Sequence, residues 1–376
     1  MRILACTALA GLVVLASGRA DLLQSAEPGL SPRPLQLSLE WNARQFVQAD
    51  AKGRVFLLRG DTLEVYPLAG GKLGKSFRLR AETPLRGELI SAAMSGGGSR
   101  WLLASSSEVL YFEDGEQKTI PAPGWVTTAA GFSGEDPVVA VLPMRIGKGE
   151  RPRTPPQVLK FDGRKWELLI AGSFPERTSG GDPLGGMLVQ HTVSLAPASK
   201  SRLWMFYPYA YRVGRFSSLG KRDLGMVVSA GKVTVREDQE QARKELEAKL
   251  EKGGYKRTGN MVVGATLARR LLLGVAQGRD GRLYVVSRDG EGVAMDRYDP
   301  VTALLERSPL RISYSEELSL AAGRDGLVLA GAWGKSGRWS LTWEEIDGAS
   351  WKEVSDVEWL GTTGKANAAP EIEKQD

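Results

Sequence analysis

The sequence of 376 residues contains one cysteine, one histidine and three asparagines. The cysteine, Cys6, lies in an N-terminal segment that we expect to be removed, so the remaining chain has no thiol. Disulfides, cysteine zinc sites, iron–sulfur clusters and cysteine nucleophiles are therefore excluded for that remaining chain. Any histidine-based triad or multi-histidine metal site would have to depend on His191 alone.

Long apolar runs are also scarce. The longest, residues 3–16, is shorter than the ~20 residues that span a bilayer. It follows an arginine and precedes small residues that end at Ala20, which is the pattern of a secretory signal peptide. We expect residues 1–20 to be a signal peptide and the mature protein to be soluble and exported, in the periplasm or outside a bacterial cell.

Charge of one sign does not dominate any part of the chain. The 50 basic and 44 acidic residues give a formal net charge of +6, and the basic residues are scattered among the acidic ones. Nucleic-acid binding would require a basic face interleaved with stacking aromatic residues, so no nucleic-acid partner is predicted. Contact with an anionic partner or a membrane surface stays open, but the sequence does not predict it.

The chain does contain a repeated phrase, in which a turn and a basic or small residue precede a strand of apolar and aromatic residues. The clearest copies are residues 52–58 and 280–286, and weaker copies begin at Ser99, Asp136, Ser201 and Asp325. Where no insertion lengthens them, the intervals between successive copies match the ~40–50 residues of a four-stranded propeller blade. The phrase predicts an all-β fold, a six-bladed β-propeller, or a seven-bladed one if residues 139–200 or 203–281 contain another unit.

The segments between and around the repeats complete this prediction. Residues 21–34 are rich in proline and indicate an extended leader, and residues 35–41 alternate like a strand that completes the last blade. The propeller would then span residues 35–361. Residues 237–252 predict one inserted surface helix, because their charges pair at i,i+4 and Gly253-Gly254 follows. The polar tail, residues 362–376, is expected to be disordered.

One repeat resembles a known kind of propeller. Residues 280–286 read Asp-Gly-Arg-Leu-Tyr-Val-Val, and a later strand ends at Tyr298-Asp299-Pro300. This combination resembles the blades of six-bladed propellers of the NHL and TolB-like kind. The resemblance implies the fold. Such propellers are protein scaffolds, lactonase-type metal hydrolases, lyases or oxidoreductases, and no functional residue of theirs carries over to this sequence.

The most unusual local feature is a run of tyrosines at alternate positions. In a continuous strand, Tyr207, Tyr209 and Tyr211 would project to one side, and Trp204 and Phe206 would face the core. Together with the adjacent Arg212, the tyrosines would form a ridge that binds a ligand or peptide. The alternative is that they pack between blades with their hydroxyls reaching solvent. Pro208 favours an edge strand or a loop.

The sequence assigns no catalytic residue. His191 lies in a strand-like stretch and is included with the tyrosine ridge as a candidate binding residue. We therefore expect an exported binding or scaffolding module with a protein or peptide partner and without a cofactor or metal. The alternative is a metal-dependent hydrolase of the lactonase type, with acidic calcium ligands at the central funnel. The scarcity of asparagine, found only at Asn42, Asn260 and Asn367, counts against that alternative.

Overall fold

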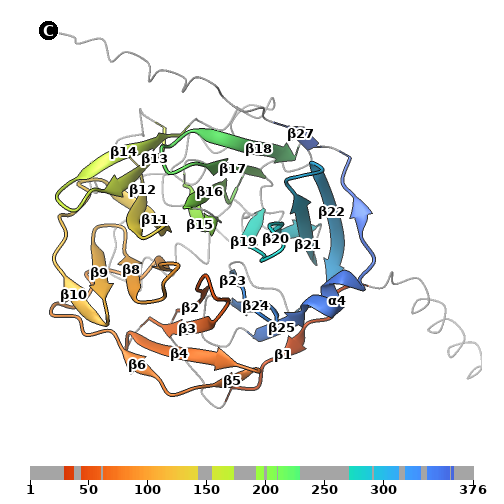
Figure 1. The fold of residues 1–376 in the computed structure, drawn as a ribbon, viewed down its shortest axis with the longest axis horizontal. Helices are drawn as coiled ribbons and strands as arrows, with labels where there is room; N and C mark the ends of the chain where they lie inside the picture. The colour runs from red at the N-terminus through yellow and green to blue at the C-terminus, as the bar shows by residue number, and fades with distance from the viewer. Residues whose placement is uncertain are drawn as a thin grey trace, which may run out of the picture.

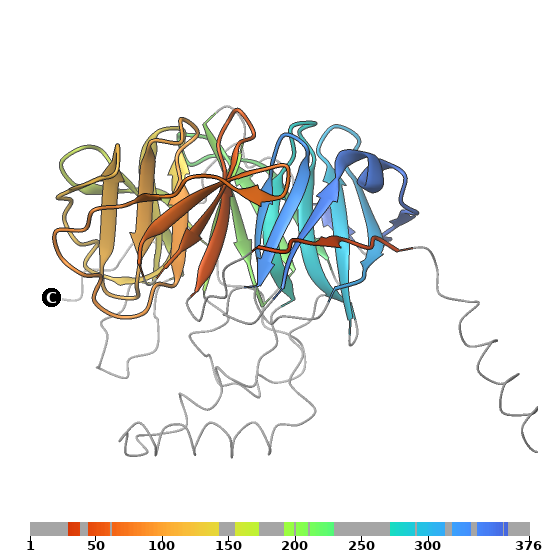
Figure 2. The ribbon, with the colours of Figure 1, turned by 90° about the horizontal axis from the view of Figure 1, so that it is seen from below.

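The computed structural model describes residues 29–37, 44–60, 62–142, 155–172, 192–198, 201–209, 211–228, 271–289, 292–312, 318–331, 337–355 and 357–359. Within these residues, six antiparallel sheets surround a central axis as the blades of a ring (Figure 1). The strands of the blades cross the thickness of the ring (Figure 2). The fold is a six-bladed β-propeller, which confirms the predicted class and blade number.

The strands of each blade follow one another from the axis outward. Blade one contains β2 (Gln45–Ala49), β3 (Val55–Arg59), β4 (Glu64–Ala69), β5 (Lys72–Leu73) and β6 (Phe77–Arg78), of which β5 and β6 both pair with β4. Blade two contains β7 (Ser91–Met94), β8 (Arg100–Ala104), β9 (Val109–Glu113) and β10 (Glu116–Lys118). Blade three contains β11 (Val126–Ser133), β12 (Asp136–Leu142), β13 (Gln157–Phe161) and β14 (Trp166–Ala171).

The other three blades recruit strands from the two ends of the chain. Blade four contains β15 (Ser194–Ala198), β16 (Arg202–Tyr207), β17 (Arg212–Phe216), β18 (Arg222–Val228) and β27 (Val357–Trp359). Blade five contains β19 (Leu272–Gln277), β20 (Leu283–Asp289), β21 (Gly292–Asp299), β22 (Leu304–Leu310) and β26 (Lys352–Glu353). Blade six contains β23 (Leu318–Ala322), β24 (Gly326–Gly331), β25 (Arg338–Thr342) and β1 (Arg33–Pro34).

Each copy of the repeated phrase forms the second strand of one blade: β3, β8, β12, β16, β20 and β24. In the two clearest copies, the turn before the strand contains a glycine at positive φ, Gly53 at 74° and Gly281 at 84°. This conformation carries a steric penalty for other residues, which explains the glycine at the start of the phrase.

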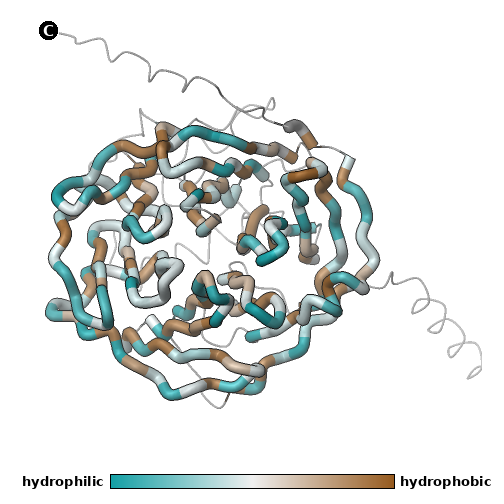
Figure 3. The backbone as a smooth tube through the Cα atoms, viewed as in Figure 1, coloured by the Kyte–Doolittle hydropathy of each residue, from teal (hydrophilic) through white to brown (hydrophobic). Residues whose placement is uncertain are grey.

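The core consists of six apolar clusters, one between each pair of neighbouring blades. In β3, Val55 and Leu57 face blade six, whereas Phe56 and Leu58 face blade two. Because both faces of a blade are covered, its second strand is a continuous apolar run instead of an alternating one. Apolar residues accordingly recur in every blade (Figure 3). Full burial of one such side chain contributes about 1.5–3 kcal/mol.

The ring is closed by a strand from the beginning of the chain, as expected, but at a different place. The closing strand is β1, which pairs with β25 on the outer edge of blade six. Of the predicted strand over residues 35–41, residues 35–37 form no strand, and residues 38–41 lie outside the described residues. Pro34 lacks an N–H, which makes β1 a poor template for a further strand.

The first and last described segments of the chain run along the outer rim of the ring. Before β1, Leu30 is buried against blade five and exchanges backbone hydrogen bonds with Pro309 and Arg311. After β25, the C-terminal segment passes blade five as β26 and reaches blade four as β27. An ion pair of 2.7 Å joins Arg33 to Glu345, so the two rim segments also contact each other.

The described helix is α4 (Trp343–Asp347), which follows blade six. Thr342 and Glu345 form a capping box at its start, since each side chain accepts the other residue's backbone N–H. The predicted helix over residues 237–252, the signal peptide over 1–20 and the tail over 362–376 all lie outside the described residues. Among the residues that are described, no helix is long and apolar enough to cross a membrane.

Candidate functional site

The six innermost strands enclose a cavity on the ring axis. This cavity, here called the channel mouth, has a volume of about 420 Å³ and receives residues from β2, β7, β11, β15, β19 and β23. It lies at the end of the ring where these strands begin, because Ser91, Val126 and Ser194 are the first residues of their strands. A concave site with this volume is in the range of ligand-binding pockets.

The accessible lining of the channel mouth is neutral. Its half-buried polar residues carry hydroxyl or amide groups and are Gln48, Ser91, Thr128, Thr192, Ser194, Tyr209 and Ser319. Apolar side chains, including Ile90 and Leu195, separate them. The described lining contains no carboxylate, and its cation is Arg44, which is 8% exposed and donates to Glu88 and to the Leu89 carbonyl.

Several of these polar side chains also connect neighbouring blades. Ser319 of blade six accepts the Val47 N–H of blade one at 2.8 Å, and Gln48 of blade one donates to the Ala92 carbonyl of blade two at 3.1 Å. Similarly, Ser91 of blade two accepts a backbone N–H of blade three, and Thr128 of blade three donates to the Val193 carbonyl. The wall of the channel mouth is therefore held by cross-blade hydrogen bonds, and its polar groups are fixed in place.

Two fully buried polar groups in this wall have no hydrogen-bond partner among the described residues, Gln45 Nε2 and Thr127 Oγ1. The Gln45 Oε1 atom accepts from Arg338 Nε at 2.7 Å. Because a guanidinium group only donates, this bond fixes the orientation of the amide and leaves Nε2 as the available donor. Buried polar groups normally pair, so these two are exceptions, and because protein covers them they do not belong to the accessible lining.

The predicted tyrosine ridge is wrong as a surface. Strand β16 ends at Tyr207 and β17 begins at Arg212, so the tyrosines lie in a hairpin and not along one strand. Tyr207 is 4% exposed and packs between blades three and four, while Tyr211 is 3% exposed and packs between blades four and five. The prediction assumed that only one face of the strand is buried. In the propeller, neighbouring blades cover both faces of the blade.

The structure separates the other predicted site residues. Tyr209 is half-buried and lines the channel mouth together with Pro208, which lies in the turn as expected. Arg212 lies over the Tyr207 ring, with its guanidinium carbon 5.6 Å from the ring centroid. His191 lies outside the described residues. Tyr209 is thus the residue of the predicted set that is placed at a cavity.

The acidic calcium site of the hydrolase alternative is not favoured. Among the described residues, no group of three or more histidine, cysteine, aspartate or glutamate side chains is arranged to hold a metal ion. Hard cations such as calcium bind carboxylate and carbonyl oxygens, and the described lining of the channel mouth offers no carboxylate. Sequence reasoning missed the hydroxyl-rich lining because serine and threonine at the start of inner strands form no recognisable motif.

Comparison with known proteins assigns no family to the chain. No family model and no curated protein matches the chain. Virginiamycin B lyase from Staphylococcus aureus is 14% identical, with a TM-score of 0.44 over 87% of this chain and 88% of the lyase. The WD40 repeats of RRP9 are 11% identical, with a TM-score of 0.44 over 84% and 99%. A luciferin-regenerating enzyme is 10% identical, with a TM-score of 0.42 over 81% and 92%.

Proposed function

We propose that this chain is an exported binding module that holds an uncharged segment of a protein or peptide partner at the channel mouth. The observation that carries the proposal is the neutral lining, in which fixed hydroxyl and amide groups alternate with apolar side chains. Export rests on the signal-peptide pattern of residues 1–20 and places the protein in the bacterial periplasm or outside the cell.

The chemistry of the lining selects against charged ligands. A carboxylate or ammonium group that enters this cavity would lose its hydration, and the described lining offers no free ion-pair partner to offset that loss. Peptide groups, in contrast, match the donors and acceptors of serine, threonine and glutamine side chains. Because these side chains are already held by cross-blade bonds, little side-chain entropy is lost on binding.

The test uses pools of hexapeptides that are acetylated and amidated, so that their ends carry no charge. One pool contains serine, threonine, glutamine, valine and leucine, and two matched pools contain glutamate or lysine at half of the positions. The neutral pool is expected to raise the unfolding midpoint of the protein, since a ligand of the native state stabilises it by mass action. The charged pools are expected to produce a smaller shift.

Two variants localise the binding. Ser194→Phe should fill the channel mouth and abolish the shift, and Tyr209→Ala should weaken it without lowering the midpoint of the free protein. Thr302→Phe is the matched control for added bulk, because Thr302 lies in an exposed turn at the opposite end of blade five. Equal shifts with all pools, or a shift that Ser194→Phe leaves intact, would overturn the proposal.

A further inference from the structure

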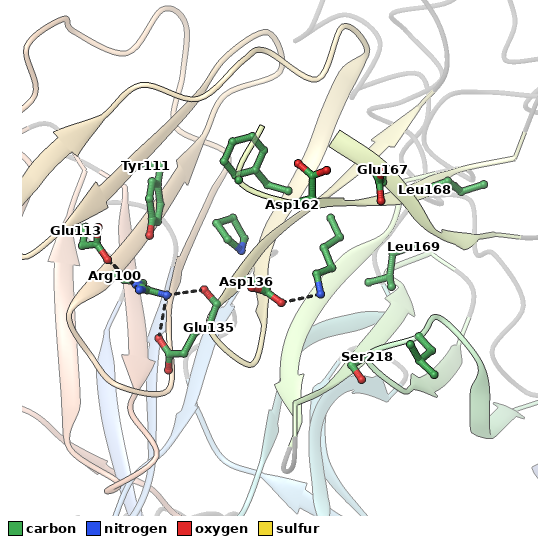
Figure 4. Close-up of a pocket in the computed structure, with 15 residues that line it drawn as sticks. Arg100, Tyr111, Glu113, Glu135, Asp136, Asp162, Glu167, Leu168, Leu169 and Ser218 are labelled. Atoms are coloured by element: carbon green, nitrogen blue, oxygen red, sulfur yellow. Dashed lines mark hydrogen bonds and ion pairs between the residues drawn. The ribbon is translucent and has the colours of Figure 1, made fainter. Parts of the chain in front are cut away.

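A second concave surface lies at the other end of the ring. It has a volume of about 690 Å³ and is formed by blades two, three and four (Figure 4). We call it the rim groove. Its lining includes Arg100 and Asp136, the first residues of β8 and β12. Because antiparallel second strands begin where the inner strands end, the rim groove opens at the ring end opposite to the channel mouth.

The rim groove is acidic although the chain as a whole is basic. Its lining contains five carboxylates against two cations, a formal charge of −3, compared with +6 for the whole chain. The carboxylates belong to Glu113, Glu135, Asp136, Asp162 and Glu167. Lys160 pairs with Asp136 at 2.6 Å, and Arg100 pairs with Glu113 at 2.9 Å and approaches Glu135 at 3.9 Å.

Two carboxylates are not neutralised by the cations of the lining. Backbone N–H groups of Lys165 and Arg164 donate to Asp162 and lower its pKa, so this group stays ionised at neutral pH. Glu167 pairs with Lys165 at 3.0 Å, but both side chains are more than half exposed. Such an exposed pair is weak and easily exchanged for another cation. Both carboxylates are therefore accessible to a positively charged partner.

The lining of the rim groove also contains exposed apolar side chains. Leu168 projects from β14 with 53% exposure, and Leu219 projects from the turn between β17 and β18 with 78% exposure. The strand and the turn are held close together, because Gly220 lies directly against the Leu169 carbonyl. Exposed leucines that border accessible carboxylates in one rigid concave surface form an amphipathic groove, with a combination of features typical of interfaces.

We propose that the rim groove docks a short segment of a partner protein in which lysine or arginine alternates with an aliphatic residue. Charge complementarity selects this occupant, since the accessible carboxylates attract the cations while Leu168 and Leu219 contact the aliphatic side chains. The proposal goes beyond the channel mouth, because it gives the ring a second binding face. A protein with two such faces holds two partners at once and acts as an adaptor.

Fluorescence anisotropy with a labelled hexapeptide of alternating leucine and lysine tests the proposal directly. We expect binding that weakens when the salt concentration rises from about 0.05 M to about 0.5 M, because salt screens exposed charge pairs. A leucine–glutamate peptide of the same length should not bind, and a serine–lysine peptide should bind more weakly. Equal binding of the leucine–glutamate peptide would contradict the proposal.

Variants at exposed positions keep the test independent of folding. Leu219→Ser and Glu167→Gln should each weaken binding roughly fivefold or more, as for a central interface residue. Val301→Ser and Glu116→Gln are the matched controls, since both residues are exposed and lie outside the groove. Unchanged binding in both groove variants would overturn the proposal.

Two further experiments distinguish this proposal from self-association of the chain and from binding at the channel mouth. If the protein is a dimer that Leu219→Ser converts to a monomer, the occupant is a second copy of the chain and the adaptor proposal fails. Binding of the neutral hexapeptide pool should be lost in Ser194→Phe and retained in Leu219→Ser. The reverse pattern should hold for the leucine–lysine peptide, so each proposal can fail without the other.

Discussion

Tyr211 donates a hydrogen bond of 2.6 Å to Asp296, and this bond joins blade four to blade five inside the ring. Asp296 is fully buried and also accepts from Ser287 at 2.7 Å and from Arg307 at 2.7 and 3.0 Å. A buried carboxylate is tolerated when its oxygens are paired in this way. The hydroxyl of Tyr211 is therefore one part of a network that fixes two blades relative to each other.

Removing that hydroxyl should destabilise the protein. Tyr211→Phe leaves the ring in place but deprives the buried Asp296 of one donor, so we expect the free energy of unfolding to fall by about 1–3 kcal/mol. Urea denaturation measures this loss. Val301→Ala, at an exposed turn, is the control and should change the free energy by less than about 0.5 kcal/mol. If Tyr211→Phe leaves the free energy of unfolding unchanged, the Tyr211 hydroxyl does not contribute to stability.

Stability should decline at alkaline pH because of buried tyrosines. Burial raises the pKa of Tyr298 to about 12, and burial together with the nearby Asp296 raises the pKa of Tyr211 well above its usual value. In the unfolded chain both hydroxyls ionise near pH ~10. Above that pH the unfolded state releases protons that the folded state retains, so the free energy of unfolding falls as pH rises.

The slope of this decline is measurable. Each such tyrosine contributes up to about 1.4 kcal/mol per pH unit between pH ~10 and its folded pKa. Urea denaturation at a series of pH values from neutral to alkaline gives the slope. Tyr298→Phe should make the slope shallower, because this variant has one tyrosine fewer to ionise on unfolding. A slope that this substitution does not alter would rule out Tyr298 as a contributor.

Gly220 should be intolerant of any side chain. It adopts a φ of 72°, and a Cβ at this position would overlap the carbonyl oxygen of Leu169 in β14. Gly220→Ala should therefore lower the free energy of unfolding by about 1–3 kcal/mol and disturb the contact between blades three and four. Gly70→Ala is the matched control, since Gly70 has a φ of 55° with no atom within 4 Å of its Cβ position. Equal losses would mean that the backbone conformation alone is responsible.

Closure of the ring should depend on apolar burial more than on charge. Leu30→Ala removes a buried side chain between blades five and six and should cost about 2–5 kcal/mol. Arg33→Ala breaks the ion pair with Glu345, but Arg33 is largely exposed, so less than about 1 kcal/mol is expected. Thermal and urea unfolding of both variants compare the two effects. A larger loss in Arg33→Ala would reverse this ranking.

The fold could be predicted because its repeat is local. The repeat occupies about seven positions and occurs once in each blade. It consists of a turn, a basic or small residue and a continuous apolar strand, and in the clearest copies the turn contains glycine. The position of the closing strand could not be predicted in the same way. Arg33 and Pro34 show no alternation, and they form a strand only because the edge of β25 is available to them.

The candidate site was harder to predict because it depends on contacts between blades. The alternation of Tyr207, Tyr209 and Tyr211 is real, but whether a face is covered depends on the neighbouring blade and on where the hairpin turns. Likewise, the residues of the rim groove come from three blades, with Arg100 and Leu219 far apart in the sequence. Only the closed ring brings them to one surface.

The pairing of β1 with β25 also determines the order of events during synthesis. Arg33 and its partner Ser340 are more than 300 positions apart, so the first strand to leave the ribosome must wait for the last blade before it can pair. Contacts between such distant segments form slowly. Until they form, β25 presents an open edge that can recruit a strand from another chain. Pairing of Arg33 and Pro34 with β25 then covers this edge.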